Sequence, residues 1–198
     1  MFKKIFLFLF AICMLVSCSK ISCSKNNQTK IEHIVCFGDS LTYGYGATAG
    51  QTYPYFLQQL TNLPVINKGF NGNTSRGALN IIDDILQFRN SIVIVEFGAN
   101  DFFQQVPILQ TKNNMEQIVD KLKSVNDIVV LVSTEDTQMK QLYIMLKSLA
   151  KEKNVLFIDG MLNEIWNNRN LFSDKVHPNS KGYKIIADKI YKNIKHLL

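Results

Sequence analysis

The sequence of 198 residues is long enough for one domain with a substantial hydrophobic core, whereas two domains would each be small. Its composition, 46% hydrophobic and 19% charged, is that of a globular protein and excludes a chain that is disordered throughout. The formal net charge is +6, but the basic residues are scattered and form no run. We therefore expect no nucleic-acid partner.

The N-terminal segment has the pattern of an export signal. Two lysines precede an uninterrupted apolar run at residues 5–16, which is shorter than the roughly 20 residues that span a bilayer. The run ends in the sequence LVSC, which is similar to the bacterial lipobox, whose cysteine is acylated. We expect residues 1–17 to be a lipoprotein signal peptide and a lipid on Cys18 to anchor the protein to a membrane of the bacterial cell envelope. A secretory signal cut nearby and an uncleaved anchor are the alternatives.

Residues 18–30 are polar and nearly free of apolar side chains, which indicates a flexible tether in front of a folded domain at 31–198. The four cysteines of the sequence give no disulfide framework. Cys36 lies in an apolar run, and we expect it to be a small core residue.

Short apolar runs alternate with amphipathic stretches from residue 31 onward. Strands are predicted at 31–37, 65–67, 91–97, 127–132 and 155–158, and helices at 53–61, 76–88, 115–124, 138–153 and 181–198. The runs IVIVEF and IVVLV are apolar throughout, as expected when helices cover both faces of a sheet. The alternation predicts a three-layer α/β domain with a parallel sheet.

A serine stands where such a fold places its functional sites, at the carboxyl end of a strand. Ser40 follows the first predicted strand directly, in the sequence GDSL. The nucleophile elbow G-x-S-x-G is absent, because Thr42 occupies the position of its second glycine. Ser40 is therefore either a turn residue or the nucleophile of a different serine-hydrolase design.

A serine nucleophile needs a base, and the base needs a group that orients it. The sequence has three histidines, of which His33 lies at the wrong end of its strand and His196 lies next to the C-terminus. His177 remains, three residues after Asp174. On its own, D-x-x-H more often indicates a helix-capping turn with a solvated histidine.

Two further loops are expected at the same edge of the sheet. NKGFNGNTS (67–75) contains Gly72 and leaves the second strand, and FGAND (97–101) contains Asn100 and leaves the third. Both loops offer amide donors for a developing oxyanion. The same residue types also occur in ordinary turns.

Four blocks in this order resemble the SGNH (GDSL) hydrolase family, nearest to its branch of thioesterase I, lysophospholipases and arylesterases. The blocks are GDSL (38–41), Gly72 within NKGFNGNTS, GAND (98–101) and DKVHP (174–178). The resemblance runs through nearly the whole domain. It implies a flavodoxin-like parallel sheet of about five strands with helices on both faces.

The resemblance also implies roles for single residues. Ser40 would attack the acyl carbon, His177 would act as general base and then acid, and Asp174 would orient His177. The backbone N–H groups of Ser40 and Gly72 and the side-chain amide of Asn100 would hold the oxyanion.

The resemblance makes Asp39 a structural residue, and neither a cofactor nor a metal is expected. Phe70, Asn71 and Asn73 depart from the GVSGDTS-like sequence of that branch. The exit of the fourth strand, STEDTQMKQLY (133–143), is short and lacks the proline-rich loop of the branch, which predicts a more open cleft.

Apolar side chains near the strand exits are candidates for contact with an acyl group. They are Tyr43, Tyr45, Phe102, Phe103, Ile108 and Leu109. Phe102 and Phe103 either line the cleft or pack as core. We expect a monomer that hydrolyses small-molecule or lipid acyl esters; the alternatives are a carbohydrate or peptidoglycan O-acetylesterase and a non-catalytic surface lipoprotein.

Overall fold

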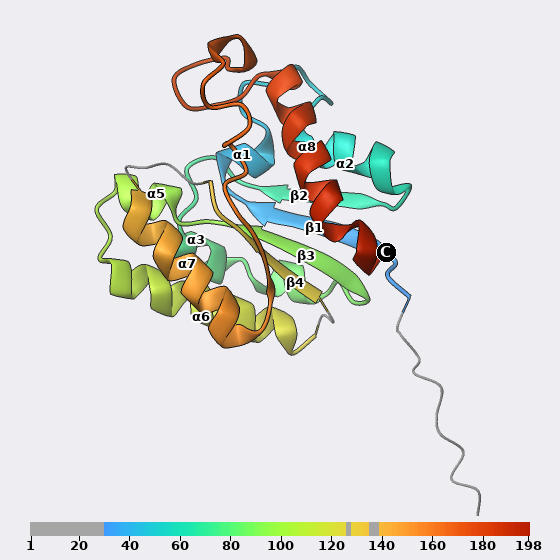
Figure 1. The fold of residues 1–198 in the computed structure, drawn as a ribbon. Helices are drawn as coiled ribbons and strands as arrows, with labels where there is room; N and C mark the ends of the chain where they lie inside the picture. Colours follow the sequence, from blue (N-terminus) through green and yellow to red (C-terminus); the bar gives the residue numbers. More distant parts are fainter. Residues whose placement is uncertain (1–29, 126–127, 135–138) are drawn as a thin grey trace, which may run out of the picture.

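The computed structural model describes residues 30–125, 128–134 and 139–198, and these form an α/β fold around one parallel sheet (Figure 1). The strands are β1 (His33–Gly38), β2 (Val65–Gly69), β3 (Ser91–Glu96), β4 (Ile128–Val132) and β5 (Leu156–Ile158). Every pairing is parallel, and the strand order is β2-β1-β3-β4-β5. The predicted fold class is confirmed. The predicted signal peptide, Cys18 and the tether up to residue 29 lie outside the described residues.

Helices cover both faces of the sheet. They are α1 (Ser40–Tyr43), α2 (Tyr53–Thr61), α3 (Ser75–Asn80), α4 (Asp83–Leu86), α5 (Ala99–Phe103), α6 (Ile108–Lys123), α7 (Lys140–Lys153) and α8 (Ser180–Ile194). Figure 1 shows α2 and α8 together on one side and α3, α6 and α7 on the other. Among the described residues, no helix is both long and apolar enough to cross a membrane.

Each central strand sends alternate side chains into two separate cores, as the two-residue period of a strand requires. In β1, Val35 and Phe37 join the core under α3, α6 and α7, whereas Ile34 and Cys36 join the core under α2 and α8. All four side chains are fully buried. This explains why the strands are apolar throughout, and it confirms Cys36 as a core residue.

The strand order places a crevice at the carboxyl end of β1. The chain leaves β1 for β2 on one side and later returns to pair β3 with the other side of β1. The loops after β1 and β3 therefore run in opposite directions from neighbouring strands. Ligands of open α/β sheets bind at such a switch point.

Several helices differ from the sequence-based prediction. The helix expected at 76–88 is two short helices, because the chain leaves α-helical geometry at Ile81 (φ −117°, ψ 10°), beside a second β-branched residue. The helix expected from residue 115 begins at Ile108, directly after Pro107. The segments after β1 and β3, expected to be loops, form the short helices α1 and α5.

Candidate active site

Ser40 is held at the end of β1 by the residue before it. Asp39 is the N-cap of α1, and its Oδ1 accepts a hydrogen bond from the Leu41 N–H at 3.0 Å. An N-cap carboxylate satisfies a backbone donor that a helix leaves without a partner. Gly38 completes the turn, because a Cβ at this position would overlap the Thr42 side chain and the Glu96 carbonyl oxygen. The serine hydroxyl is therefore fixed at the carboxyl edge of the sheet.

The segment that carries His177 is closed by backbone hydrogen bonds. Phe172 and Pro178 form an antiparallel bridge, and the Ser173 N–H donates to the His177 carbonyl at 2.9 Å. Directly after this bridge, Asn179 caps α8 by accepting hydrogen bonds from the first-turn N–H groups. The histidine loop is thus attached to a long buried helix, which limits its freedom.

Asp174, His177 and Ser40 form one hydrogen-bonded chain. The Asp174 Oδ2 lies 2.8 Å from the His177 Nδ1, and the His177 Nε2 lies 3.0 Å from the Ser40 Oγ. The other oxygen of Asp174 accepts hydrogen bonds from the Val176 N–H at 2.8 Å and the His177 N–H at 2.7 Å. Residues 137 positions apart in the sequence therefore meet within hydrogen-bond distance, as the sequence predicted.

The carboxylate of Asp174 is ionised under ordinary conditions. Partial burial opposes its charge, but the hydrogen bonds from the His177 backbone and ring and from the Val176 N–H outweigh burial and lower the pKa of Asp174 to about 2. An ionised Asp174 accepts a hydrogen bond from the Nδ1–H of His177, which leaves Nε2 as the acceptor that faces the Ser40 hydroxyl.

The other two histidines lie away from this chain of hydrogen bonds, as expected from the sequence. His33 opens β1 at the opposite edge of the sheet, with its ring 5.5 Å from that of Phe88. His196 belongs to a 3₁₀ turn near the C-terminus and is exposed.

Asn100 connects three loops at the crevice. Its Nδ2 donates to the Asp39 Oδ2 at 2.9 Å and to the Asn73 carbonyl at 3.0 Å. Gly72, the residue before Asn73, has a φ of +71° and nothing within 4 Å of its Cβ position. Within the described chain, the backbone N–H groups of Ser40 and Gly72 have no hydrogen-bond acceptor. The structure thus brings the loops of all three predicted oxyanion donors together, with the Asn100 amide already engaged.

A buried polar cluster fixes the loop that contains Gly72. The Asp101 carboxylate accepts hydrogen bonds from the Ser75 N–H at 2.8 Å, from the Ser75 hydroxyl and from the Thr111 hydroxyl at 3.4 Å. Asn114 of α6 donates to the Ser75 hydroxyl at 3.0 Å. Each of these side chains is at least 95% buried. The start of α3 is consequently tied to both α5 and α6.

A second buried carboxylate lies behind Asp39. The Glu96 Oε2 accepts hydrogen bonds from the Asp39 N–H at 3.3 Å and from the Thr42 hydroxyl at 3.1 Å. Burial, reinforced by the charge of Asp39, raises the pKa of Glu96 well above its ordinary value. Burial also raises the pKa of Asp39, to about 6. Burial therefore favours the protonated form of Glu96, while the Asp39 carboxylate is held by hydrogen bonds from Leu41 and Asn100.

A cavity of about 640 Å³ opens beside Ser40 and His177. Its other walls are mostly apolar, with Arg169 and Lys175 as cations; the lining residues are Asp39, Ser40, Leu41, Ala99, Asn100, Phe103, Thr134, Met139, Leu162, Trp166, Arg169, Lys175, Val176 and His177. Within the described part of the chain, no group of three or more His, Cys, Asp or Glu side chains is placed to hold a metal ion.

Two of the six side chains predicted to contact substrate lie beside the catalytic groups. Phe103 lines the cavity, and the Tyr45 ring lies 4.6 Å from the His177 ring, measured between centroids. Phe103 is 58% exposed, which excludes a core position for it.

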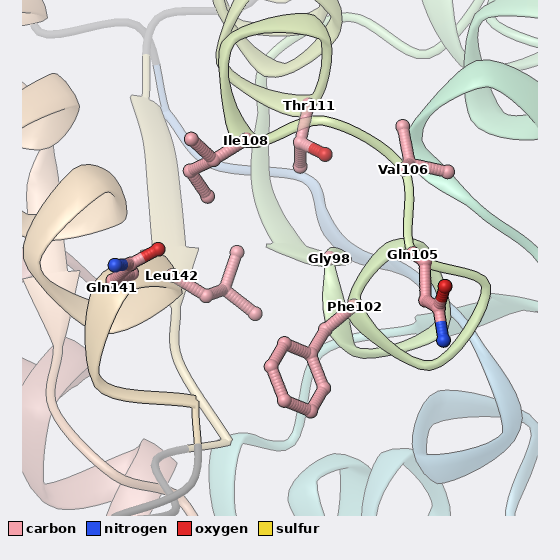
Figure 2. A pocket seen from close by; sticks show the side chains of 8 residues that line it. All are labelled: Gly98, Phe102, Gln105, Val106, Ile108, Thr111, Gln141 and Leu142. Atoms are coloured by element: carbon pink, nitrogen blue, oxygen red, sulfur yellow. The ribbon is translucent and has the colours of Figure 1, made fainter.

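Phe102 and Ile108 line a separate hollow of about 300 Å³ with Gln141 and Leu142 of α7 and are not among the residues that line the cavity beside Ser40 (Figure 2). Successive residues of the short helix α5 point in different directions, so Phe102 and Phe103 face different spaces. Tyr43 and Leu109 are exposed and are not among the residues that line the catalytic cavity.

Sequence reasoning missed the cavity wall formed by the segment after β5. Leu162, Trp166 and Arg169 line the cavity from turns and the start of a short 3₁₀ helix, a stretch in which the sequence analysis placed no helix or strand. In the sequence, only the position of these residues directly before the histidine loop could have indicated that they line the cavity. Met139 and Thr134 also line the cavity and flank the exit of the fourth strand. The prediction of a more open cleft at this exit depends on residues 135–138, which lie outside the described residues.

Comparison with known proteins agrees with this geometry. Residues 36–185 match the GDSL-like lipase/acylhydrolase family. The chain is 26% identical to the thioesterase 1/protease 1/lysophospholipase L1 of Escherichia coli K12 over 178 residues, covering 83% of this chain and 84% of that protein. It is 28% identical to the isoamyl acetate-hydrolyzing esterase of Saccharomyces cerevisiae over 212 residues, covering 82% and 86%.

A solved structure shares the fold. The psychrotrophic esterase EstA from Pseudoalteromonas sp. superposes with a TM-score of 0.76 at 25% identity, covering 84% of this chain and 98% of that one. The family match spans both the Ser40 and the His177 loops. The chain therefore belongs to the GDSL-like lipase/acylhydrolase family and is a hydrolase of ester bonds.

Proposed function

We propose that the protein hydrolyses carboxylic acyl esters through an acyl-enzyme on Ser40. The observation that carries this proposal is the unbroken hydrogen-bonded chain from Asp174 through His177 to Ser40, at 2.8 and 3.0 Å. The His177 Nε2 takes the hydroxyl proton while the Ser40 Oγ attacks the acyl carbon. The ionised Asp174 stabilises the imidazolium that forms.

The oxyanion of the tetrahedral intermediate is bound by the N–H groups of Ser40 and Gly72 and by the Asn100 side chain. The first two donors are free within the described chain, and Asn100 turns one of its two amide hydrogens from a protein acceptor toward the oxyanion. His177 then protonates the leaving oxygen, and the acyl group stays on Ser40. Water, deprotonated by His177, releases the acid and restores the serine.

Asp39 acts as a positioning residue in this scheme. Its two oxygens hold the Leu41 N–H and the Asn100 amide, so one carboxylate fixes the turn of the nucleophile and the orientation of an oxyanion donor together. A neutral amide has an acceptor oxygen at only one of these two positions, so it cannot hold both donors in the same geometry.

We propose a medium-length acyl group as substrate, because the cavity is roomy and Phe103, Met139 and Leu162 make its wall apolar. The E. coli relative, named as a thioesterase and lysophospholipase, supports this choice. The second candidate is an acetyl ester, as for a carbohydrate or peptidoglycan O-acetylesterase. It is favoured by the yeast relative, which is named for hydrolysis of isoamyl acetate.

We propose further that Cys18 carries the lipid that keeps the enzyme at a membrane of the cell envelope. The support is the sequence pattern of residues 1–18, which lies outside the described residues.

Ser40→Ala and His177→Ala should each lower kcat/KM on 4-nitrophenyl esters by about a thousandfold or more, because either change breaks proton transfer from the nucleophile. A 4-nitrophenyl phosphonate ester should phosphonylate Ser40 in the wild type, with release of nitrophenolate, and mass spectrometry should find the adduct on the Ser40 peptide. Ser124→Ala, at an exposed serine, is the control. Full activity in His177→Ala would refute the assignment, and equal inertness of wild type and Ser40→Ala would favour a binding protein.

Across 4-nitrophenyl acetate, butyrate, hexanoate and octanoate, kcat/KM should rise by about tenfold or more, since each buried methylene contributes about 0.8 kcal/mol. Phe103→Ala should flatten this rise, because Phe103 lines the cavity. Leu109→Ala, at a side chain 66% exposed, is the matched control. A maximum at acetate would support the O-acetylesterase instead.

Asp39→Asn should lower kcat by about tenfold or more, because Asn100 loses a partner.

Asp39→Asn should also alter the pH dependence of the free energy of unfolding. The folded pKa of Asp39, about 6, lies above its ordinary 3.8, so the folded state binds more protons and the free energy of unfolding falls as the pH rises across this interval. Urea unfolding from pH 4 to pH 7 should show a shallower fall in Asp39→Asn than in the wild type. Asp83→Asn, at an exposed carboxylate, is the control. If Asp39→Asn kept the wild-type kcat and the wild-type dependence of unfolding free energy on pH, the positioning role of Asp39 would be contradicted.

Mass spectrometry of the membrane fraction should find an N-terminal peptide that begins at an acylated Cys18. Cys18→Ser should release the protein from that fraction, whereas Cys23→Ser, five residues later, should leave it there. An unmodified chain that begins at another residue would count against the lipid anchor.

A further inference from the structure

We propose that Arg169 and Lys175 make the enzyme prefer esters whose leaving group carries an anion, either a carboxylate or a phosphate. This inference rests on the proposed function, because it assigns the leaving group to one side of the catalytic cavity. Both cations line that cavity, together with His177.

The direction of the leaving group follows from the proton transfers. The acyl group remains on Ser40, while the leaving oxygen takes its proton from the His177 Nε2 and must therefore lie against His177. Lys175 is two residues before His177 on the same loop, and Arg169 donates from Nη1 to the Lys175 carbonyl at 3.1 Å. The rest of the leaving group thus departs along the wall that carries these two cations.

Arg169 is held in place before any ligand binds. Its guanidinium lies over the Trp166 ring at 5.5 Å and the Phe172 ring at 5.4 Å, measured to the centroids, and it donates the one hydrogen bond to the Lys175 carbonyl. A guanidinium has five N–H donors, so most of them remain available to a planar or tetrahedral oxyanion. Because the side chain is already ordered, binding an anion costs less conformational entropy than it would at a free arginine.

The acidic groups nearby do not neutralise these cations. No ion pair joins Arg169 or Lys175 to an acidic side chain of the described residues. Asp174, next to Lys175, uses both oxygens on His177 and Val176. Asp39, the other acid of the cavity, is buried and holds Leu41 and Asn100. Within the described residues, Arg169 and Lys175 thus form no ion pair with an acid, and both lie exposed on the leaving-group wall.

Two esters that differ by one charge test the proposal. 4-Acyloxybenzoate and its methyl ester share the acyl group, chosen at the length that the wild type hydrolyses best, and 4-acyloxyphenyl phosphate adds a second kind of anion. Each kcat/KM is divided by the rate of alkaline hydrolysis of the same ester, which removes the difference in leaving-group reactivity. The ratio of this normalised kcat/KM for the anionic ester to that for the neutral ester should exceed one in the wild type. It should fall toward one in 0.5 M salt, because exposed charges are screened.

Arg169→Met should lower this ratio by about five- to tenfold and Lys175→Met by about two- to threefold, in line with a fixed guanidinium and a mobile ammonium. Arg89→Met, at an exposed arginine just ahead of β3 and thus at the opposite edge of the sheet, should leave it unchanged. The anionic ester, carboxylate or phosphate, with the larger ratio to the neutral ester carries the anion that the wall prefers.

A purely structural role of Arg169 gives a different result. If Arg169 only braces the histidine loop through the Lys175 carbonyl, Arg169→Met slows all the esters equally and the ratio stays, which would overturn the proposal. A wild-type ratio of one or below would overturn it as well, while turnover of the neutral ester would leave the esterase function intact. Failure of the wild type to hydrolyse any of the esters would reject the proposed function itself.

Discussion

The carboxylate of Asp39 is the interaction on which the arrangement of the site depends. One of its oxygens caps the helix that begins with Ser40, and the other holds the amide of Asn100. Asn100 in turn holds the carbonyl of Asn73. Segments from the ends of β1, β2 and β3 are thereby fixed to one another through a single buried acid, so Ser40 and the loops that carry the proposed oxyanion donors are positioned before substrate binds. Such preorganisation lowers the cost of reorganisation during the reaction.

Burying this acid next to Glu96 is electrostatically unfavourable, and the structure shows how the cost is limited. Two adjacent buried carboxylates do not both ionise readily. Burial and the charge of Asp39 raise the pKa of Glu96 well above its ordinary value, which favours the protonated form of Glu96. Thr42 donates to its oxygen, and the Tyr53 hydroxyl lies 3.0 Å from that of Thr42, which extends the network into the core. Asp39 is left as a hydrogen-bonded anion at the edge of the cavity.

The cavity offers a substrate two kinds of surface, one apolar and one cationic. Apolar side chains such as Phe103 and Leu162 offer burial, which is not directional, whereas the two cations Arg169 and Lys175 offer attraction to charge. In the proposed mechanism, the histidine loop carries both the proton donor for the leaving group and a cation, so one short segment serves both chemistry and selectivity. Because the loop is attached to α8 through Asn179, its position is set by the packing of a long buried helix.

The sequence by itself determined the layers of the fold and indicated the three residues that are proposed to react. Uniformly apolar strands and amphipathic helices have periodicities that depend only on local geometry, and Ser40, His177 and Asp174 were identified from short motifs and their position after strands. The break at Ile81, beside a second β-branched residue, and the start of α6 at Ile108 were not predicted, because the apolar periodicity does not mark where a helix breaks or begins. Only the tertiary structure decided that Phe103 faces the cavity beside Ser40 and Phe102 a different hollow, and that a segment outside every predicted helix and strand supplies Trp166 and Arg169. These are relations between residues far apart in the chain, and they arise from how its elements pack.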